Sequence, residues 1–263
     1  MSVNAVNELE NNSGALLKIL VVDDDELNQR MMRLILIREG YQVSIASNGV
    51  EAFEMAKAYD FDVILMDLQM PVLDGIGASR RIREWESDGR HTFIVALTAS
   101  FLPEKGQELY EAGVDNYISK PFDLEHLRQI LRYSHNRDRA TGKKELSNDP
   151  FASGVSFEMG LHRVGGGKET YKELLEDFLR ELPGKLENLQ ACHMNNNLEF
   201  LSRIAHNLKG VSANLGAMRL SEQAGKLEKQ IDTGVSGEIK HIIDLVRAAA
   251  DEFQKSASEY LSE

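Results

Sequence analysis

The stretch Ile19-Leu20-Val21-Val22-Asp23-Asp24-Asp25-Glu26 places an apolar, β-branched run directly before four acidic residues. Similar apolar runs recur through the first half of the chain, with amphipathic helical spacing between them. Short apolar runs that alternate with helices are typical of a parallel sheet covered on both faces. We therefore expect a doubly wound α/β domain with five strands, at residues 19–22, 43–46, 63–66, 93–97 and 117–119.

Acidic residues close two of these predicted strands: Asp23 and Asp24 follow the first, and Asp67 follows the third. A doubly wound sheet binds ligands at the carboxyl ends of its strands, where the strand order reverses, and in the order 2-1-3-4-5 this point lies between the first and third strands. Carboxylates brought together there repel one another unless a cation intervenes. Their oxygens, with a main-chain carbonyl and water, suit Mg²⁺. The acidic run also has a structural interpretation, because acidic side chains stabilise the N-terminus of a helix.

Two further polar residues lie at predicted strand ends. Thr98 supplies a hydroxyl beside the small Ala99, and Lys120 supplies a cation before Pro121. Each alone is typical of a turn. An aspartate that attacks a phosphoryl donor needs a metal and hydrogen-bond donors that offset the charge on the phosphoryl oxygens. Thr98 and Lys120, together with the acidic residues, meet these needs and indicate that Asp67 is a phosphoryl acceptor.

The first half of the chain, residues 18–134, resembles the receiver domain of two-component signalling in all of these motifs. The resemblance implies a flavodoxin-like fold with the strand order 2-1-3-4-5, and it makes Asp67 the phosphorylated residue. It also implies that Asp24, Asp67 and the main-chain carbonyl of Gln69 bind Mg²⁺, with Asp23 acting through water.

The same resemblance assigns roles to the residues at the later strand ends. Lys120 would contact the phosphoryl group, and its peptide bond to Pro121 is expected to be cis, which proline permits at low cost. Thr98 and Tyr117 would form a switch pair, in which phosphorylation draws Thr98 inward and Tyr117 fills the vacated space. A simpler interpretation of Tyr117 is a half-buried aromatic at the sheet edge. Asp25 stands where relatives often carry Asn, and this variation could change the metal affinity.

The apolar spacing changes in the second half of the chain. Residues 135–156 show little periodicity and predict a linker. From residue 157 to residue 263 the spacing is helical throughout and predicts an antiparallel helical bundle, so the full chain is expected to be α/β plus all-α. Pro183 and residues 234–237 are expected to separate helices of this bundle.

The stretch Ala205-His206-Asn207-Leu208-Lys209-Gly210 lies within one of these predicted helices. His206, Lys209 and Gly210 share a face beside the apolar stripe. A glycine inside a helix costs about 1 kcal/mol relative to alanine, and here it leaves room for a docking partner and a phosphoryl group. Imidazole is a competent nucleophile near neutral pH, so we expect a solvent-facing His206 that accepts the group. Without other context, an exposed histidine is usually an ordinary surface residue.

The longer stretch from His206 to Ala217 resembles the signature of histidine-containing phosphotransfer (HPt) domains, which are helical bundles. The resemblance covers residues 157–263 and is weaker upstream of the histidine helix. It implies that His206 accepts a phosphoryl group, with Lys209 and Gly210 shaping its surroundings. It implies no metal at this second site, because the incoming receiver supplies Mg²⁺.

Composition narrows the possible functions. The 30 basic and 42 acidic residues give a formal charge of −12, which disfavours binding to nucleic acid or anionic lipid. Cys192 is the single cysteine, which excludes an intramolecular disulfide and a thiolate metal cluster. Residues 1–17 form a polar, flexible N-terminus, and no segment predicts a signal peptide or membrane insertion, so we expect a cytoplasmic protein.

These observations predict a phosphorelay signalling intermediate and not an enzyme, because no pattern predicts a nucleotide-binding kinase module. The chain would accept phosphoryl groups on Asp67 and on His206 and pass them between protein partners. The partners would be a histidine kinase and other receiver or HPt domains. The alternative is a binding module in which phosphorylated Asp67 controls partner docking and His206 is a silent scaffold residue. The direction of flow, and exchange between the two residues of one molecule, stay open.

Overall fold

The computed structural model describes residues 16–86, 89–98, 103–121, 124–135, 155–165, 167–233 and 238–262. The chain divides into two compact units, Met1–Ser147 and Asn148–Glu263, and each is described by itself. Most of the predicted flexible N-terminus and of the predicted linker at 135–156 lies outside the described residues.

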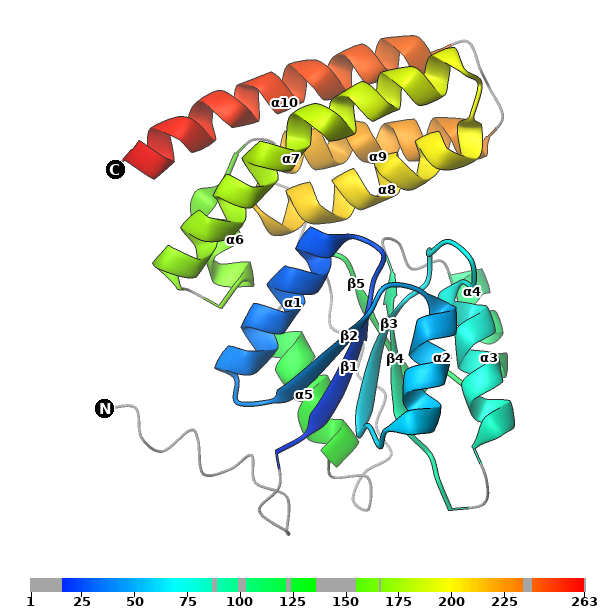
Figure 1. Ribbon diagram of the computed structural model, residues 1–263. Helices are drawn as coiled ribbons and strands as arrows, with labels where there is room; N and C mark the ends of the chain where they lie inside the picture. Colours follow the sequence, from blue (N-terminus) through cyan, green and yellow to red (C-terminus); the bar gives the residue numbers. More distant parts are fainter. Residues whose placement is uncertain are drawn as a thin grey trace. The chain divides into compact units, whose positions relative to one another are not determined.

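A five-stranded parallel sheet forms the centre of the first unit, with the strand order β2-β1-β3-β4-β5 (Figure 1). This confirms the predicted doubly wound sheet and its strand order. The three central strands β1, β3 and β4 are apolar and buried through most of their length, as expected of parallel strands that helices cover on both faces. The strands are β1 (Lys18–Val22), β2 (Gln42–Ala46), β3 (Val63–Asp67), β4 (Phe93–Thr98) and β5 (Asn116–Ser119).

Helices cover both faces of this sheet, with α1 and α5 on one face and α2 and α3 on the other (Figure 1). The core between them contains fully buried Leu20, Ile64 and Ile94 from three neighbouring strands. The helices of the first unit are α1 (Glu26–Arg38), α2 (Gly49–Ala58), α3 (Gly75–Trp85), α4 (Pro103–Glu111) and α5 (Leu124–His135).

The strand register gathers the polar strand ends at one edge of the sheet. Val22 of β1 pairs with Met66 of β3, so the residues that follow them, Asp23 and Asp67, come next to each other. On the other side of β3, Asp67 pairs with Leu97 of β4. The convergence of the predicted site residues thus follows from parallel strands that end in step.

The second unit is a helical bundle, as the sequence predicts. Its mainly aliphatic core contains an aromatic group, in which Tyr171 and Phe178 on one long helix are buried together with Phe253 on another. No helix in the described part of the chain is both long and apolar enough to cross a membrane. The helices of this unit are α6 (Phe157–Arg163), α7 (Lys168–Met194), α8 (Leu198–Asn214), α9 (Met218–Asp232) and α10 (Ile239–Ser262).

The expectation that Pro183 separates two helices is wrong, because α7 continues through it. A proline inside a helix removes one backbone hydrogen bond and disfavours the turn before it. Here Pro183 is exposed, while Leu182 and Leu186 on either side are buried. Packing of the apolar face therefore outweighs the local cost of the proline. The other predicted break, at 234–237, lies outside the described residues.

The segment around α6 closes the end of α8. The Ser156 N–H donates to the Gly216 carbonyl at 2.9 Å, and the Tyr171 hydroxyl donates to the Leu215 carbonyl at 2.7 Å. The Arg163 guanidinium donates to the carbonyl of Ala213. The last carbonyls of a helix have no partner within the helix, so these contacts pair groups at the end of the histidine-bearing helix.

In the first unit, the close approach of α3 to the end of β3 can be tested at Gly75, the first residue of α3. A Cβ placed there would overlap the main-chain carbonyl of Asp67. We expect Gly75→Ala to lower the free energy of unfolding of the first unit by about 2 kcal/mol, since overpacking forces the backbone to shift. Urea unfolding followed by the fluorescence of Trp85, the single tryptophan, measures this.

Gly184→Ala is the matched control, because a Cβ at Gly184 in α7 meets nothing within 4 Å. It should leave the Trp85 transition unchanged. A Gly75→Ala variant as stable as the unmodified chain would contradict the close approach of α3 to Asp67.

Candidate functional site

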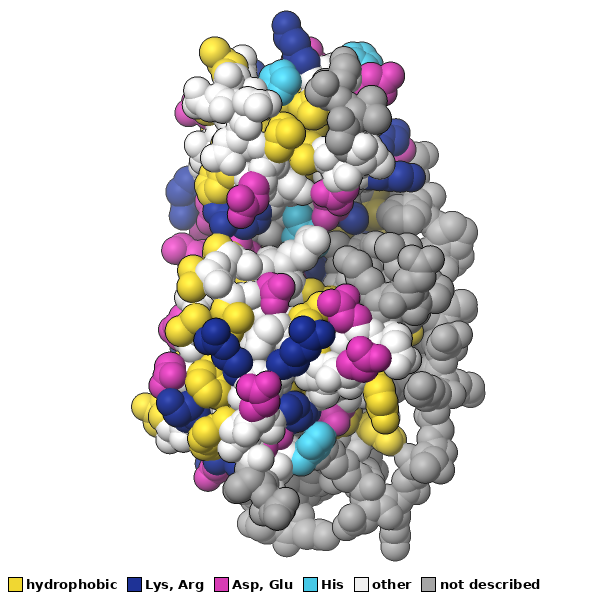
Figure 2. Space-filling view, turned by 90° about the vertical axis from the view of Figure 1, so that its right-hand side faces the viewer, with side chains coloured by type: hydrophobic (Ala, Val, Ile, Leu, Met, Phe, Trp, Pro, Cys, Tyr) yellow, Lys and Arg dark blue, Asp and Glu magenta, His cyan; other side chains and the backbone are white. Residues whose placement is uncertain are grey.

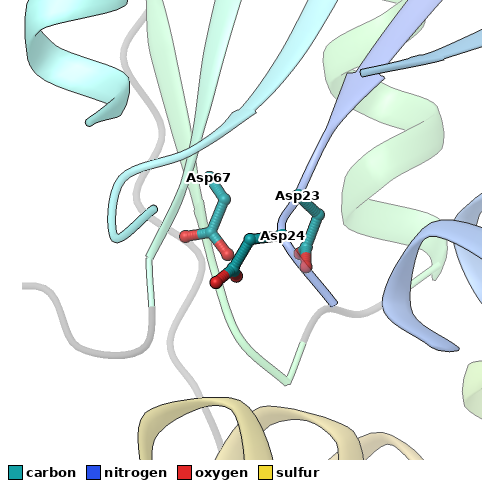
Figure 3. A group of neighbouring side chains, drawn as sticks. All are labelled: Asp23, Asp24 and Asp67. Carbon is teal, nitrogen blue, oxygen red and sulfur yellow. The ribbon is translucent and has the colours of Figure 1, made fainter. Parts of the chain in front are cut away.

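Three carboxylates meet at the carboxyl edge of the sheet, at the ends of β1 and β3 (Figure 3). Oxygen atoms of Asp23, Asp24 and Asp67 all lie within 4.8 Å of one another. Asp23 and Asp67 are buried, and Asp24 is partly exposed. Burial weakens the screening of like charges by water, so this group needs a cation.

Lys120 supplies a cation from the segment after β5. Its Nζ donates to Asp23 Oδ2 at 2.8 Å and to Asp67 Oδ2 at 2.5 Å. The Asp67 carboxylate is also oriented by the Gln69 N–H, which donates to Oδ1 at 3.1 Å. The Lys120–Pro121 peptide bond is cis, as predicted.

Burial raises the pKa of the Asp23 carboxyl to about 7, and the negative charge of Asp67 adds to this while Lys120 opposes it. Burial acts to lower the pKa of Lys120, but the charges of Asp23 and Asp67 outweigh it and hold that pKa above its ordinary value. Lys120 is therefore charged at neutral pH, and Asp23 titrates near neutrality when no further cation is bound.

The acidic run Asp23-Asp24-Asp25 serves two purposes. The Asp25 carboxylate accepts hydrogen bonds from the backbone N–H groups of Leu27 and Asn28, both at 3.1 Å, and so caps α1. The structural interpretation of the run is thus right for Asp25, while Asp23 and Asp24 contribute to the carboxylate group (Figure 3).

Thr98 and Tyr117, the predicted switch pair, lie on the neighbouring strands β4 and β5. Thr98, the last residue of β4, is buried, and its carbonyl accepts a hydrogen bond from the Lys120 N–H at 2.5 Å. Tyr117 in β5 is partly buried and packs against the core of the first unit. Their proposed movement on phosphorylation stays a prediction.

The donor set at this edge fits Mg²⁺. The three groups that could ligate an ion are carboxylates, and hard oxygen ligands suit Mg²⁺ better than they suit zinc or copper. The partial exposure of Asp24 leaves an approach for a hydrated ion. The contribution of the Gln69 carbonyl to this site stays a prediction.

The second predicted site lies on α8 and includes a residue from the next helix. His206 Nδ1 lies 2.7 Å from Oε1 of Glu228 on α9. An ionised carboxylate only accepts hydrogen bonds, so we infer that Nδ1 carries the ring proton. Nε2 then keeps its lone pair and is the nucleophilic atom.

Glu228 also binds Lys209, whose Nζ donates to its Oε2 at 3.1 Å. Burial acts to raise the pKa of Glu228, but the hydrogen bonds and charges of His206 and Lys209 outweigh it and lower that pKa. The stem of Lys209 crosses α9 at Gly225, where an added Cβ would lie 3.4 Å from its Cδ and Cε. One carboxylate therefore orients both the imidazole and the ammonium.

The expectation of a solvent-facing imidazole is wrong, because only 5% of His206 is exposed. One edge of the ring lies against Glu228, which reaches it from the neighbouring helix. The helical pattern places His206 beside the apolar stripe of α8 but contains no information about the side chain that faces it. The predicted transfer to Nε2 would require a phosphoryl donor to reach the other edge of the ring, away from Glu228.

Sequence reasoning missed Glu228 and Asn28. Glu228 lies next to Leu227, a residue of the apolar stripe of α9. An acidic residue beside a buried stripe was the signal that could have indicated a buried polar contact. Asn28 lies between Leu27 and Met31 on the buried side of α1, and its amide donates to Asp23 Oδ1 at 3.2 Å. A polar residue at a buried helical position was the signal there.

Comparison with known families matches both halves of the chain. The family model described as the response regulator receiver domain matches residues 19–132. The family model of the Hpt domain matches residues 173–258. The first match covers the carboxylate group and Lys120, and the second covers His206, Lys209 and Glu228.

Two curated relatives match most of this chain. The chain is 28% identical over 244 residues to the signal transduction histidine-protein kinase BarA of Shigella flexneri, covering 89% of this chain and 26% of BarA. It is 28% identical over 247 residues to the sensor histidine kinase GacS of Pseudomonas protegens, covering 89% of this chain and 27% of GacS. The chain thus spans about a quarter of the length of these curated relatives.

Solved structures resemble the first unit. The receiver domain of the sensor histidine kinase PA1611 from Pseudomonas aeruginosa, described with magnesium in its active site cleft, is 37% identical; the match covers 46% of this chain and 98% of that one, with a TM-score of 0.43. A complex of Ypd1 with the receiver domain of Ssk1 from Saccharomyces cerevisiae matches at 30% identity over 47% of this chain and 91% of that one, with a TM-score of 0.44.

The raised pKa of Asp23 predicts how pH affects the first unit without Mg²⁺. Because the pKa in the folded state, about 7, exceeds the ordinary value of 3.8, folding takes up a proton between these values. This contribution to stability is fully present below pH 3.8 and is lost as the pH rises through about 7. Between pH 5 and pH 8, Asp23→Asn should gain about 1–3 kcal/mol relative to the unmodified chain.

Urea unfolding followed by Trp85 fluorescence, with chelator present, measures this difference. Asp62→Asn, which changes an exposed carboxylate of the same unit, is the control and should follow the unmodified chain. Parallel pH curves for Asp23→Asn and the unmodified chain would show that burial of Asp23 is not coupled to its protonation.

Proposed function

We propose that this chain, in which a receiver domain is followed by an Hpt domain, is a phosphorelay intermediate of two-component signalling. It accepts phosphoryl groups on Asp67 and on His206 and passes them between proteins. The observation that carries this proposal is the presence in one chain of a carboxylate nucleophile beside Lys120 and an imidazole oriented by Glu228.

At the receiver site, a carboxylate oxygen of Asp67 attacks the phosphorus of a partner's phosphohistidine. The new P–O bond forms as the P–N bond breaks, and the electron pair returns to the partner's imidazole. Lys120 already contacts Asp67 and is placed to pair with a phosphoryl oxygen. Mg²⁺, held by Asp24, Asp67 and the Gln69 carbonyl with Asp23 acting through water, would offset the charge on the other phosphoryl oxygens.

At the histidine site, Nε2 of His206 attacks the phosphorus of a partner's aspartyl phosphate and releases its carboxylate. Glu228 keeps the ring proton on Nδ1 and stabilises the positive charge that the ring gains as the N–P bond forms. Lys209, now on Glu228, is one helical turn from His206 and can turn to the phosphoryl oxygens.

The partners follow from this chemistry. A histidine kinase or an HPt domain would serve Asp67, and a receiver domain would serve His206. On the face shown in Figure 2, basic and acidic side chains are interspersed among the described residues, which gives no support to a nucleic-acid surface there. We propose that the chain acts in the cytoplasm, where such kinases present their catalytic parts.

The low exposure of His206 favours one alternative function. In it, phosphorylation of Asp67 changes the docking of a partner, and His206 is a structural residue paired with Glu228. The two functions differ in whether the imidazole ever carries phosphate.

Phosphoryl labelling distinguishes them. With labelled ATP, a cognate hybrid kinase and Mg²⁺, the chain should carry two kinds of label, because an acyl phosphate is labile to alkali and a phosphoramidate is labile to acid. Asp67→Asn should remove the alkali-labile label and His206→Gln the acid-labile label, each by more than about tenfold, since each removes the only nucleophile of its site.

His193→Gln, a histidine at the end of α7, is the matched control and should keep both labels. If both kinds of label stay unchanged in Asp67→Asn and in His206→Gln, the relay is rejected. Loss of the alkali-labile label alone, with no acid-labile label in the unmodified chain, would support the alternative.

Glu228 provides a second test of the histidine site. Glu228→Gln should slow phosphorylation of His206 by a phosphorylated receiver about tenfold, and Glu228→Ala should slow it further, because a hydrogen bond to a charged group contributes about 1.5–3 kcal/mol. Glu222→Gln is the control, since Glu222 pairs with Lys226 on the exposed side of α9. Equal rates for all three variants would mean that Glu228 does not orient the ring.

A further inference from the structure

Asn28 connects the first turn of α1 to the carboxylate group. Its side chain is 4% exposed, and its Nδ2 donates to Asp23 Oδ1 at 3.2 Å. None of the roles that the resemblance implies belongs to Asn28. A buried amide directed at a buried carboxylate therefore needs its own explanation.

Asn28 completes the set of donors around the Asp23 carboxylate. Oδ1 also accepts the Asp25 N–H at 3.0 Å, whereas Oδ2 accepts Lys120 Nζ at 2.8 Å. Two donors on Oδ1 fix the plane of the carboxylate and leave Oδ2 as the oxygen on the cation side. Without Nδ2, the carboxylate can rotate and present both oxygens to Lys120.

The side chain of Asn28 is held in one orientation. Its backbone N–H donates to the Asp25 carboxylate at 3.1 Å, which fixes the residue in the capped turn. Turning the amide over would set its oxygen against Asp23 Oδ1, two acceptors facing each other. The donor side of the amide therefore faces Asp23.

The carbonyl oxygen of this amide is buried and has no hydrogen-bond partner among the described protein groups. A buried acceptor left unpaired is destabilising, so folding stability alone does not account for an asparagine here. A hydrated Mg²⁺ ion brings water molecules that can donate to such an oxygen.

We propose that Asn28 is a positioning residue for Mg²⁺ and acts through Asp23. This inference rests on the proposed function, because it assumes that the carboxylate group binds the ion. Asn28 holds the orientation of the Asp23 carboxylate, so that Lys120 contacts only Oδ2. In this orientation the carboxylate can accept a hydrogen bond from a metal-bound water. Partners of this kind, one step removed from the metal, typically contribute about 10- to 100-fold to metal affinity.

Calorimetric titration of the full chain with Mg²⁺ tests the proposal. Asn28→Leu, which keeps the branched shape of the side chain and removes the donor, should bind Mg²⁺ about tenfold or more weakly than the unmodified chain. Asn28→Ala serves if the leucine variant does not fold, as judged by Trp85 fluorescence. Asn48→Ala is the matched control, because Asn48 caps α2 through the N–H groups of Val50 and Glu51.

The outcomes distinguish the role of Asn28 from the existence of the Mg²⁺ site. Binding to Asn28→Leu within about threefold of the unmodified chain overturns the role of Asn28, and so does an equal loss of affinity in Asn48→Ala. An unmodified chain that binds no Mg²⁺ overturns the proposed metal site itself. Weakened binding in the Asn28 variants alone, with Asn48→Ala unchanged, supports the positioning role.

Discussion

The contact of the Lys120 ammonium with Asp23 and Asp67 is the interaction on which the receiver site depends. Three carboxylates lie within 4.8 Å at a buried edge, and like charges in such a place are held together only by a cation. The parallel register brings them there, so the fold itself creates the repulsion that Lys120 relieves. Lys120 offsets only part of the repulsion among the three carboxylates. The remaining negative charge destabilises the fold locally and favours the binding of a second cation.

The histidine site satisfies its charge differently. Each oxygen of Glu228 accepts from a side chain of α8, one from His206 and one from the Lys209 ammonium, so the groups that satisfy this carboxylate are part of the protein. The receiver edge has three carboxylates near one lysine, and the bundle has one carboxylate near a lysine and an imidazole. This difference in charge balance supports the proposal of a metal-assisted acyl phosphate at the first site and a phosphoramidate at the second.

Local patterns in the sequence predicted most of the receiver. The strand at 63–66 reads as apolar and ends in Asp67, and parallel strands bring such ends together, so Asp23, Asp24, Asp67 and Lys120 could be placed from periodicity alone. The failures have another origin. Pro183 lies within α7 because tertiary packing outweighs a local preference, and the environment of His206 depends on Glu228, 22 residues away on another helix. Spacing within one helix contains no information about the register between two helices.

Contacts from α6 and from the start of α7 show that the family match and the packed unit begin at different residues. The Hpt family match begins at residue 173, yet Tyr171 and Arg163, which pair with carbonyls at the end of α8, both precede it. A polypeptide shortened to the matched region would lose both donors to those carbonyls and should fray the end of the helix that carries His206. The sequence match to the Hpt family therefore begins later in the chain than the packed helical unit does. A shortened polypeptide that keeps this unit intact should begin before Val155, which pairs with Ala217.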